Sequence, residues 1–126
     1  MADDEENLRL VLKTLLKRNG YEVETASSGE EALALVESFG PDFVLTDVRM
    51  PRMGGLDLLS TLKAKGNEAT VIVMSAYGSN DLAIEAMKSG AYDYVSKPFK
   101  PDEIVLTLKK AEERETLRRE NRALRE

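Results

Sequence analysis

Apolar side chains recur along this chain with two different periods, and the two periods follow one another in a regular order. Residues 8–16 carry apolar side chains every three to four positions, which predicts a helix that ends at Asn19-Gly20. The apolar face of that helix is formed by Leu8, Val11, Leu12, Leu15 and Leu16. Residues 21–25 instead alternate between apolar and polar side chains, so they predict a strand.

The same order of helix and strand repeats through the next part of the chain. Short runs of β-forming residues predict strands at 43–46, 70–75 and 92–96. The segment Ser28-Gly29-Glu30-Glu31 has the spacing of a capping box, and Ser79-Asn80-Asp81 can cap another helix. The helical patterns stop at Gly20, Gly40, Gly66 and Gly90. Because strands alternate with helices, we expect an α/β fold in which helices wrap a parallel sheet.

The last helical pattern begins at Pro101, with acidic residues in its first turn, and is predicted to outrun the domain. Beyond Ala111 almost every residue is charged, Leu or Ala. We therefore expect a domain at 1–108 and a helical linker at 109–126. Two structures fit the linker: a solvated helix, or a short coiled coil in which Leu117 and Leu124 face a partner.

Composition excludes several classes of function. The chain has 126 residues and suits one domain, and it contains no cysteine and no histidine. Disulfides, zinc thiolate sites, a Ser-His-Asp triad and a phosphohistidine carrier are therefore ruled out. The formal net charge of −5 argues against binding to nucleic acid, and no stretch is long enough to span a membrane. We expect a cytoplasmic module.

The candidate chemistry starts at Asp47, which follows the predicted strand 43–46. Pro51 and Gly54-Gly55 then require a loop before the next helical pattern. In open α/β sheets, ligands bind at the carboxyl ends of the strands. Taken alone, Asp47 fits a ligand site and an ordinary turn equally well.

Three more polar features are predicted at the same end of the sheet. Asp3-Asp4 precedes the first helix, Ser75 ends a strand, and Lys97 ends the last strand. Each has an ordinary interpretation by itself, such as helix capping or solvation. Together the carboxylates suit Mg²⁺, the lysine and serine suit a phosphoryl group, and an ionised aspartate can act as the nucleophile that forms an acyl phosphate.

Four motifs in order give this chain a family resemblance. They are the acid pair, Asp-Val-Arg-Met-Pro-Arg-Met-Gly-Gly from Asp47, Val-Ile-Val-Met-Ser-Ala, and Tyr-Val-Ser-Lys-Pro-Phe. From Asp3 to about Leu108 the chain resembles the receiver domain of two-component response regulators, which implies a flavodoxin-like, doubly wound parallel sheet. The tail, with Arg-Arg-Glu-Asn-Arg-Ala-Leu-Arg, resembles the linker of NtrC-like regulators.

The resemblance implies a role for each matching residue. Asp47 would be the phosphoacceptor, and Asp3, Asp4 and the backbone carbonyl of Arg49 would join it in holding Mg²⁺. Ser75 and Lys97 would bind the phosphoryl group, and Lys97-Pro98 would be a cis peptide.

Two further positions concern switching and lifetime. Tyr94 would be the aromatic switch residue that moves when Ser75 is drawn to the phosphate, although a strand aromatic that packs against a helix is the alternative. Arg49 and Tyr77, two residues past Asp47 and Ser75, would tune the lifetime of the phosphoryl bond. Tyr77 is expected to slow its hydrolysis.

The resemblance also implies partners for the chain. A sensor histidine kinase would donate the phosphoryl group. An output domain, outside this chain, would act downstream to control transcription, and the domain could form a homodimer. Any binding to DNA would lie outside these residues.

The sequence departs from the family at its beginning. The family's sheet starts with an apolar strand that carries the acid pair, whereas only Met1 and Ala2 precede Asp3 here. About four missing apolar residues, at roughly 1.5–3 kcal/mol each, would remove on the order of 6–12 kcal/mol of stabilisation. A start that lacks residues is our expectation; the alternatives are that another segment or chain fills the gap, or that the sheet rearranges. If Met1 is the true start, we expect weak Mg²⁺ binding and low thermal stability.

Two other functions are weighed against the receiver. A Mg²⁺-dependent phosphatase with Asp47 as nucleophile would commonly place a second aspartate two residues later, where this chain has Arg49. An interaction module that keeps the fold without the chemistry is favoured by the missing strand and disfavoured by the presence of Asp47, Ser75 and Lys97 together.

Overall fold

The structure is a computed structural model, and it describes residues 1–3, 6–48, 53–75, 80–96 and 100–125. Within these ranges, three strands form the regular part of the sheet, and five helices pack around it or extend from it. In chain order the elements are α1 (Glu6–Arg18), α2 (Gly29–Phe39), β1 (Phe43–Asp47), α3 (Gly55–Ala64), β2 (Thr70–Ser75), α4 (Asn80–Lys88), β3 (Asp93–Ser96) and α5 (Pro101–Arg125).

The sheet is parallel, with the strand order β1-β2-β3. Phe43 pairs with Thr70 at the start of β1, and Ile72 pairs with Asp93 at the start of β3. On the other side of β1, Ala2 forms isolated parallel bridges with both Thr46 and Ala26. The first three residues therefore stand in the sheet as a very short strand between β1 and the segment before α2.

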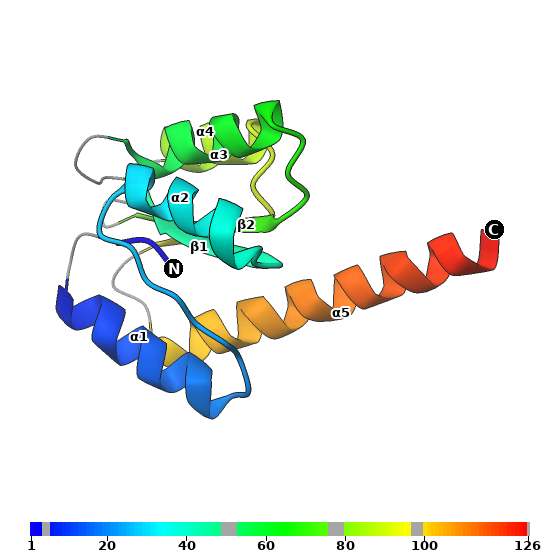
Figure 1. Cartoon of the computed structure of the whole chain (residues 1–126), viewed down its shortest axis with the longest axis horizontal. Helices are drawn as coiled ribbons and strands as arrows, with labels where there is room; N and C mark the ends of the chain where they lie inside the picture. Colours follow the sequence, from blue (N-terminus) through cyan, green and yellow to red (C-terminus); the bar gives the residue numbers. More distant parts are fainter. Residues whose placement is uncertain (4–5, 49–52, 76–79, 97–99, 126) are drawn as a thin grey trace.

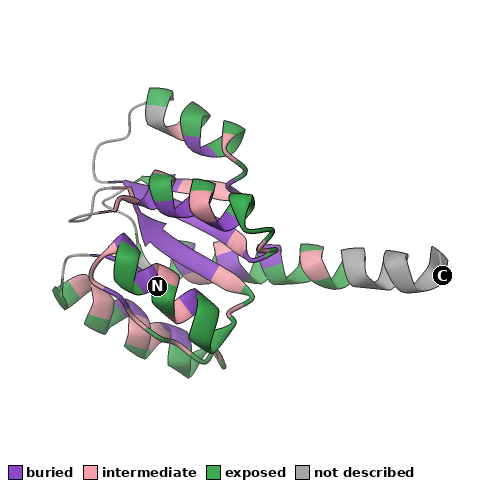
Figure 2. Ribbon diagram, turned by 45° about the horizontal axis from the view of Figure 1, so that its top comes forward, coloured by how far each residue is buried: buried purple, intermediate pink, exposed green. Residues whose placement is uncertain are grey.

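Helices cover both faces of this sheet. Figure 1 shows α1 and the start of α5 on one face, with α2 and α3 on the other. The two faces have separate apolar cores, one built on Leu12, Leu16, Ile104 and Leu108, the other on residues of α2 and α3 such as Val36 and Leu59. In Figure 2, β1 and β2 are almost wholly buried between these layers. A parallel sheet wrapped by helices, as predicted, is confirmed.

The predicted helix stops are confirmed by backbone conformation. Gly20, Gly40, Gly66 and Gly90 all have positive φ angles, between 64° and 103°. At Gly40 the backbone amide also donates to the carbonyl of Val36, which closes the last turn of α2. Glycine adopts this left-handed conformation without the steric cost that a side chain brings.

Residues 21–25 differ from the prediction, because they do not form a strand within a ladder. Their neighbour in the sheet would be the strand that is only three residues long here. The segment runs extended, its Glu24 carbonyl accepts from the Met1 amino group, and the bridge to Ala2 is formed at Ala26. The side-chain alternation was read correctly, but the pairing that makes a strand is absent.

Some apolar residues of the predicted helical faces lie outside the core. In α1, Leu12 and Leu16 are buried, whereas Val11 is 53% exposed. In α4, Ala86 is buried and Met87 is 48% exposed. The core-facing stripe of each helix is therefore narrower than the periodicity suggested.

The last helix, α5, runs without a break from Pro101 to Arg125, and its C-terminal part extends away from the sheet (Figure 1). Its first turns are held by Ile104, Leu108 and Ala111, which are buried. Further along, the Tyr21 hydroxyl donates to a carboxylate oxygen of Glu112 at 3.0 Å, and the guanidinium of Arg114 lies 5.2 Å from the centre of the Tyr92 ring. None of the helices in the described ranges is both long and apolar enough to cross a membrane.

Candidate functional site

Three of the predicted site residues, Asp3, Asp47 and Ser75, lie at one edge of the sheet, where the parallel strands end. Asp47 is the last residue of β1, and its Cα pairs with that of Met74, directly before Ser75. Asp47 is 6% exposed and Ser75 is 2% exposed. We call this edge, defined by Asp3, Asp47, Ser75 and Ser96, the carboxyl edge.

Asp3 reaches the carboxyl edge through the short N-terminal strand. The amide of Ala2 donates to the carbonyl of Leu45 at 2.7 Å, and the carbonyl of Ala2 accepts from the amide of Asp47 at 2.8 Å. On the other side, the amide of Asp3 donates to the carbonyl of Ala26 at 3.0 Å. Asp3 is therefore fixed beside Asp47 on the adjacent strand, with none of its surface exposed.

The chain leaves Asp47 through a tightly packed turn. The amide of Val48 still bonds the carbonyl of Met74 at 2.9 Å, and the amide of Gly55 bonds the carbonyl of Val48 at 2.9 Å. A Cβ atom at Gly55 would clash with the Asp47 carbonyl oxygen, so a side chain cannot fit without moving the backbone. This close approach is the physical reason for glycine at the start of α3.

Two residues at this edge were missed by the sequence analysis. A guanidinium nitrogen of Arg9, on α1, donates to the backbone carbonyl of Asp3 at 2.7 Å and ties the acid segment to the helix. The hydroxyl of Thr46 is fully buried and donates to the Asp47 carbonyl at 3.1 Å. The sequence analysis assigned no role to Arg9 and took Thr46 only as a β-forming residue of the strand, because neither hydrogen bond follows from a pattern of residue types.

Tyr94 lies on β3 with its Cα paired to that of Val73. Its ring packs against the core on the α2 and α3 side, as the ordinary interpretation of a strand aromatic predicts. Its hydroxyl, however, is buried and has no hydrogen-bond partner among the described residues. A buried hydroxyl without a partner costs free energy, so the inward position is less favourable for the tyrosine ring than it would be for a phenylalanine ring.

Several predicted site residues lie outside the described residues. They are Asp4, Arg49, Tyr77, Lys97 and Pro98. The last described residue before Lys97 is Ser96, whose Cα pairs with that of Ser75.

The described residues supply some of the ligands that a hard cation needs. Asp3 and Asp47 supply carboxylates from adjacent strands, and carboxylate oxygens are the ligands that Mg²⁺ prefers. Within the described ranges, no group of three or more possible ligating side chains is present. The two described acids fit Mg²⁺ with several retained waters, which is its usual coordination.

Comparison with known proteins gives a consistent family. The profile described as "Response regulator receiver domain" matches residues 1–109. Over 124 residues the chain is 39% identical to the regulatory protein AtoC of Escherichia coli K12, covering 98% of this chain and 27% of AtoC. It is also 40% identical over 111 residues to the DNA-binding transcriptional regulator NtrC of Salmonella typhimurium, covering 88% of this chain and 24% of NtrC.

Solved structures agree with the sequence matches. The crystal structure of NtrX from Brucella abortus superposes with a TM-score of 0.90 at 35% identity, covering 98% of this chain and 29% of NtrX. The chain thus spans about a quarter of the length of these relatives, in agreement with the expected NtrC-like resemblance. From the carboxyl edge, the fold and the match over residues 1–109, the chain belongs to the response regulator receiver domain family.

Proposed function

We propose that this chain is a phosphoacceptor switch in which a sensor histidine kinase transfers a phosphoryl group to Asp47. The observation that supports the proposal is the position of Asp3 beside Asp47 at the carboxyl edge, where the amide of Asp47 donates to the carbonyl of Ala2 and both acids are buried. Ser75, one strand further, supplies a buried hydroxyl at the same edge.

Each residue has a defined part in the transfer. A carboxylate oxygen of Asp47 attacks the phosphorus of the kinase phosphohistidine, the P–N bond breaks, and the imidazole leaves with its electron pair. Ser75 donates a hydrogen bond to a phosphoryl oxygen, and Lys97 places its ammonium against another. Asp3 and Asp4, with the Arg49 carbonyl, would hold Mg²⁺. When bound, the metal offsets the repulsion between Asp47 and the anionic donor.

The switch needs an element with two arrangements that the phosphoryl group biases. Contacts from the phosphoryl group to Ser75 and Lys97 would favour one arrangement of the segment after β2, α4 and Tyr94. The surface of α4, β3 and α5 would then act as the output or dimerisation face, with exposed apolar side chains at Ile84, Met87 and Leu106.

The wider setting follows from the relatives. Because the chain spans about a quarter of AtoC and NtrC, an output domain outside these residues would carry the response. NtrC is a DNA-binding transcriptional regulator by its name, so we place this domain in cytoplasmic control of transcription. The receiver itself is a switch that catalyses only its own phosphotransfer and dephosphorylation.

The deciding experiment is incubation of the full chain with acetyl phosphate and Mg²⁺, followed by intact mass measurement. We expect the wild type to gain the mass of one phosphoryl group and Asp47→Asn to gain none. Asp57→Asn, an exposed acid on α3, is the matched control and should be phosphorylated like the wild type. A wild type that gains no mass, or an Asp47→Asn variant that gains as much, would contradict the proposal.

The same measurement separates the alternatives. A phosphatase would consume acetyl phosphate rapidly and repeatedly while its phosphorylated form stayed scarce. An interaction module without the chemistry would neither gain mass nor consume the donor. A stable gain that is confined to chains with Asp47 is expected of the receiver alone.

A further inference from the structure

Arg9 connects helix α1 to the segment that carries Asp3. A guanidinium nitrogen of Arg9 donates to the backbone carbonyl of Asp3 at 2.7 Å, in a partly buried position. A hydrogen bond from a charged donor is shorter and stronger than one between two neutral groups. The contact between Arg9 and Asp3 is therefore stronger than each of the backbone bonds that hold the same segment in the sheet.

Both backbone polar groups of Asp3 are hydrogen-bonded. The amide of Asp3 donates to the carbonyl of Ala26 at 3.0 Å, within the sheet. The carbonyl of Asp3 accepts from Arg9, which belongs to the helical layer that covers the sheet (Figure 1). Because peptide groups are planar, fixing the groups on both sides of the Asp3 Cα restricts its two backbone dihedral angles. The direction in which the Asp3 side chain leaves the backbone is fixed with them.

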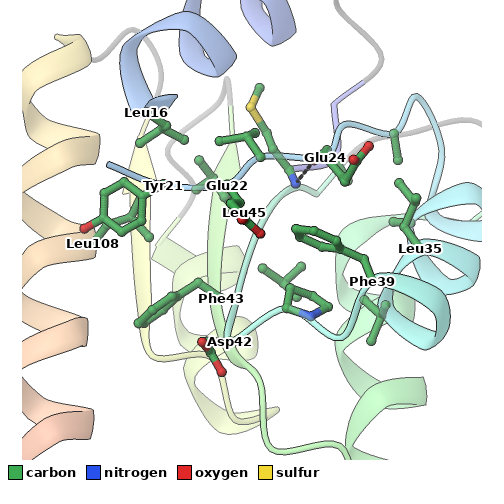
Figure 3. A pocket seen from close by; sticks show the side chains of 18 of the residues that line it. Leu16, Tyr21, Glu22, Glu24, Leu35, Phe39, Asp42, Phe43, Leu45 and Leu108 are labelled. Carbon is green, nitrogen blue, oxygen red and sulfur yellow. Dashed lines mark hydrogen bonds between the residues drawn. The ribbon is translucent and has the colours of Figure 1, made fainter. Parts of the chain in front are cut away.

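The helix that carries Arg9 is itself anchored in the core. Arg9, Leu12 and Leu16 are spaced by three and four residues, so they share one face of α1. Leu12 and Leu16 are buried in one cluster with Leu45 of β1. Figure 3 shows Leu16 on the side of the sheet where Leu108 of α5 lies. The guanidinium of Arg9 therefore projects from a helix whose position is set by apolar packing.

The charge of Arg9 and its hydrogen bond have opposite effects on a cation at the carboxyl edge. A guanidinium close to Asp3 repels Mg²⁺, so the charge by itself weakens metal binding. The hydrogen bond instead holds Asp3, which is fully buried, in its place beside Asp47. Coordination by carboxylates from two segments depends on that placement. The sign of the change in Mg²⁺ affinity on removing Arg9 therefore shows which effect is larger.

We propose that Arg9 is a positioning residue for Mg²⁺ binding, because it holds the backbone of Asp3 and so keeps the Asp3 carboxylate in place for the metal. This inference rests on the Mg²⁺ site of the proposed function and adds a residue outside the set of ligands. Coupling between two sites is reciprocal, so bound Mg²⁺ would in turn hold the first turns of α1 through the same bond. Arg9 thus links the metal site to a helix that exposes Leu10 and Val11.

The first experiment measures the dissociation constant of Mg²⁺ on the folded full chain by NMR, from the shift of the Asp47 amide signal. Arg9→Met keeps a long apolar stem and removes the donor. We expect this variant to bind Mg²⁺ about tenfold more weakly, at the lower end of the effect of losing a residue that orients a metal ligand. Arg9→Lys keeps a charged donor and should stay within about threefold of the wild type.

Lys13→Met is the matched control. Lys13 lies one turn further along α1, is half-buried like Arg9, and loses the same charge on substitution. The Mg²⁺ affinity of this variant should equal that of the wild type. Equal weakening in Lys13→Met and Arg9→Met would overturn the proposal, because the loss would then not depend on the bond to Asp3.

The remaining outcomes separate this inference from the proposed function. A wild type whose Asp47 signal does not respond to Mg²⁺ would overturn the metal site and this inference together. Binding in Arg9→Met that equals or exceeds that of the wild type would overturn this inference alone. A lower free energy of unfolding in Arg9→Met with unchanged Mg²⁺ affinity has the same meaning, since a merely structural contact would behave in that way.

Amide hydrogen exchange tests the coupling in the wild type and so does not depend on the folding of a variant. Mg²⁺ should slow exchange at Leu10 and Val11 in the first turns of α1, because the metal would restrict local opening near the Arg9 bond. Lys17, near the other end of α1, should exchange at an unchanged rate. In Arg9→Met the slowing should disappear. Exchange at Leu10 that does not respond to Mg²⁺ in a wild type that binds the metal would overturn the coupling.

Discussion

The amide of Asp47 donates a hydrogen bond of 2.8 Å to the carbonyl of Ala2, the second residue of the chain. The proposed phosphoacceptor is thus positioned by a strand of three residues, which in turn is held by Leu45 on one side and Ala26 on the other. The stability of this small ladder therefore decides how well Asp47 is held at the carboxyl edge.

Replacing Ala2 with proline tests that dependence. Proline has no backbone amide, so the 2.7 Å bond to the Leu45 carbonyl is lost in the Ala2→Pro variant. We expect the free energy of unfolding in urea to fall by about 1–3 kcal/mol, and phosphorylation of Asp47 by acetyl phosphate to slow. Ala2→Gly keeps the amide and is the control. Equal losses in both variants would contradict the role given to the bond between Ala2 and Leu45.

The buried amino terminus should make stability depend on pH. Burial lowers the pKa of the Met1 amino group from 8.0 to about 6, although the nearby Glu24 carboxylate opposes the shift. Between these values the unfolded chain binds more protons than the folded one, so the free energy of unfolding rises as the pH rises from 6 to 8. The rise should be at most about 3 kcal/mol, measured by urea unfolding.

Acetylation of the Met1 amino group provides the control for this pH effect. The acetylated chain cannot gain a proton there, so the Met1 contribution to the pH dependence of its free energy of unfolding should be absent. A slope that survives acetylation unchanged would assign the effect to another residue.

The sequence was sufficient for the parts of the fold that local chemistry determines. Sequence patterns predicted where helices end, where β2 forms and where α2 is capped. The structure confirms these features at Gly20 and Gly90, in the β-branched run of β2 and at Ser28. The Ser28 hydroxyl accepts from the amide of Glu31 as predicted, but the Glu31 carboxylate accepts from Ser27 instead of closing the capping box. The hydrogen-bond partner that a side chain takes at a helix end depends on neighbouring residues, and a sequence pattern does not specify them.

The carboxyl edge was predictable because parallel strands end together. Asp47 and Ser75 could therefore be placed at one edge from their positions after predicted strands. Arg9 could not, because nothing in its own segment indicates that it will bond the Asp3 carbonyl. The strand prediction at 21–25 failed for a related reason: strand formation depends on a neighbour, and alternation describes only the segment itself.

Removing the hydroxyl of Tyr94 should stabilise the protein. The hydroxyl oxygen is buried without a hydrogen-bond partner among the described residues, so Tyr94→Phe relieves an unpaired polar group. We expect the free energy of unfolding to stay the same or rise by up to about 2 kcal/mol, measured in urea. Tyr92→Phe, on a ring that Arg114 stacks against, is the control and should change little. A clear loss of stability in Tyr94→Phe would mean that the hydroxyl has a partner.

Tyr77 should lengthen the life of the phosphoryl group on Asp47. The family resemblance implies a place beside the site for this residue, where a bulky ring would hinder the water that attacks the acyl phosphate. We therefore expect faster loss of the phosphoryl group in Tyr77→Ala, followed by intact mass after removal of the donor. Unchanged decay relative to the wild type would refute this role, and Tyr92→Ala controls for the loss of a tyrosine as such.

The contact between Tyr21 and Glu112 should raise the pH at which Tyr21 loses its proton. Burial raises the pKa of the Tyr21 hydroxyl to about 12, and the hydrogen bond and negative charge of Glu112 add to the rise. The folded chain therefore keeps this proton between pH 10 and 12, and the stability that the contact provides is lost as the pH rises through that range. The difference in tyrosinate absorbance between the wild type and Tyr21→Phe measures the pKa directly. In Glu112→Gln we expect the pKa of Tyr21 to fall but to stay above 10, because the burial of the ring remains. Glu113→Gln is the control and should leave the pKa of Tyr21 unchanged. A Tyr21 that titrates like an exposed tyrosine in the wild type would show that α5 does not rest on this residue in solution.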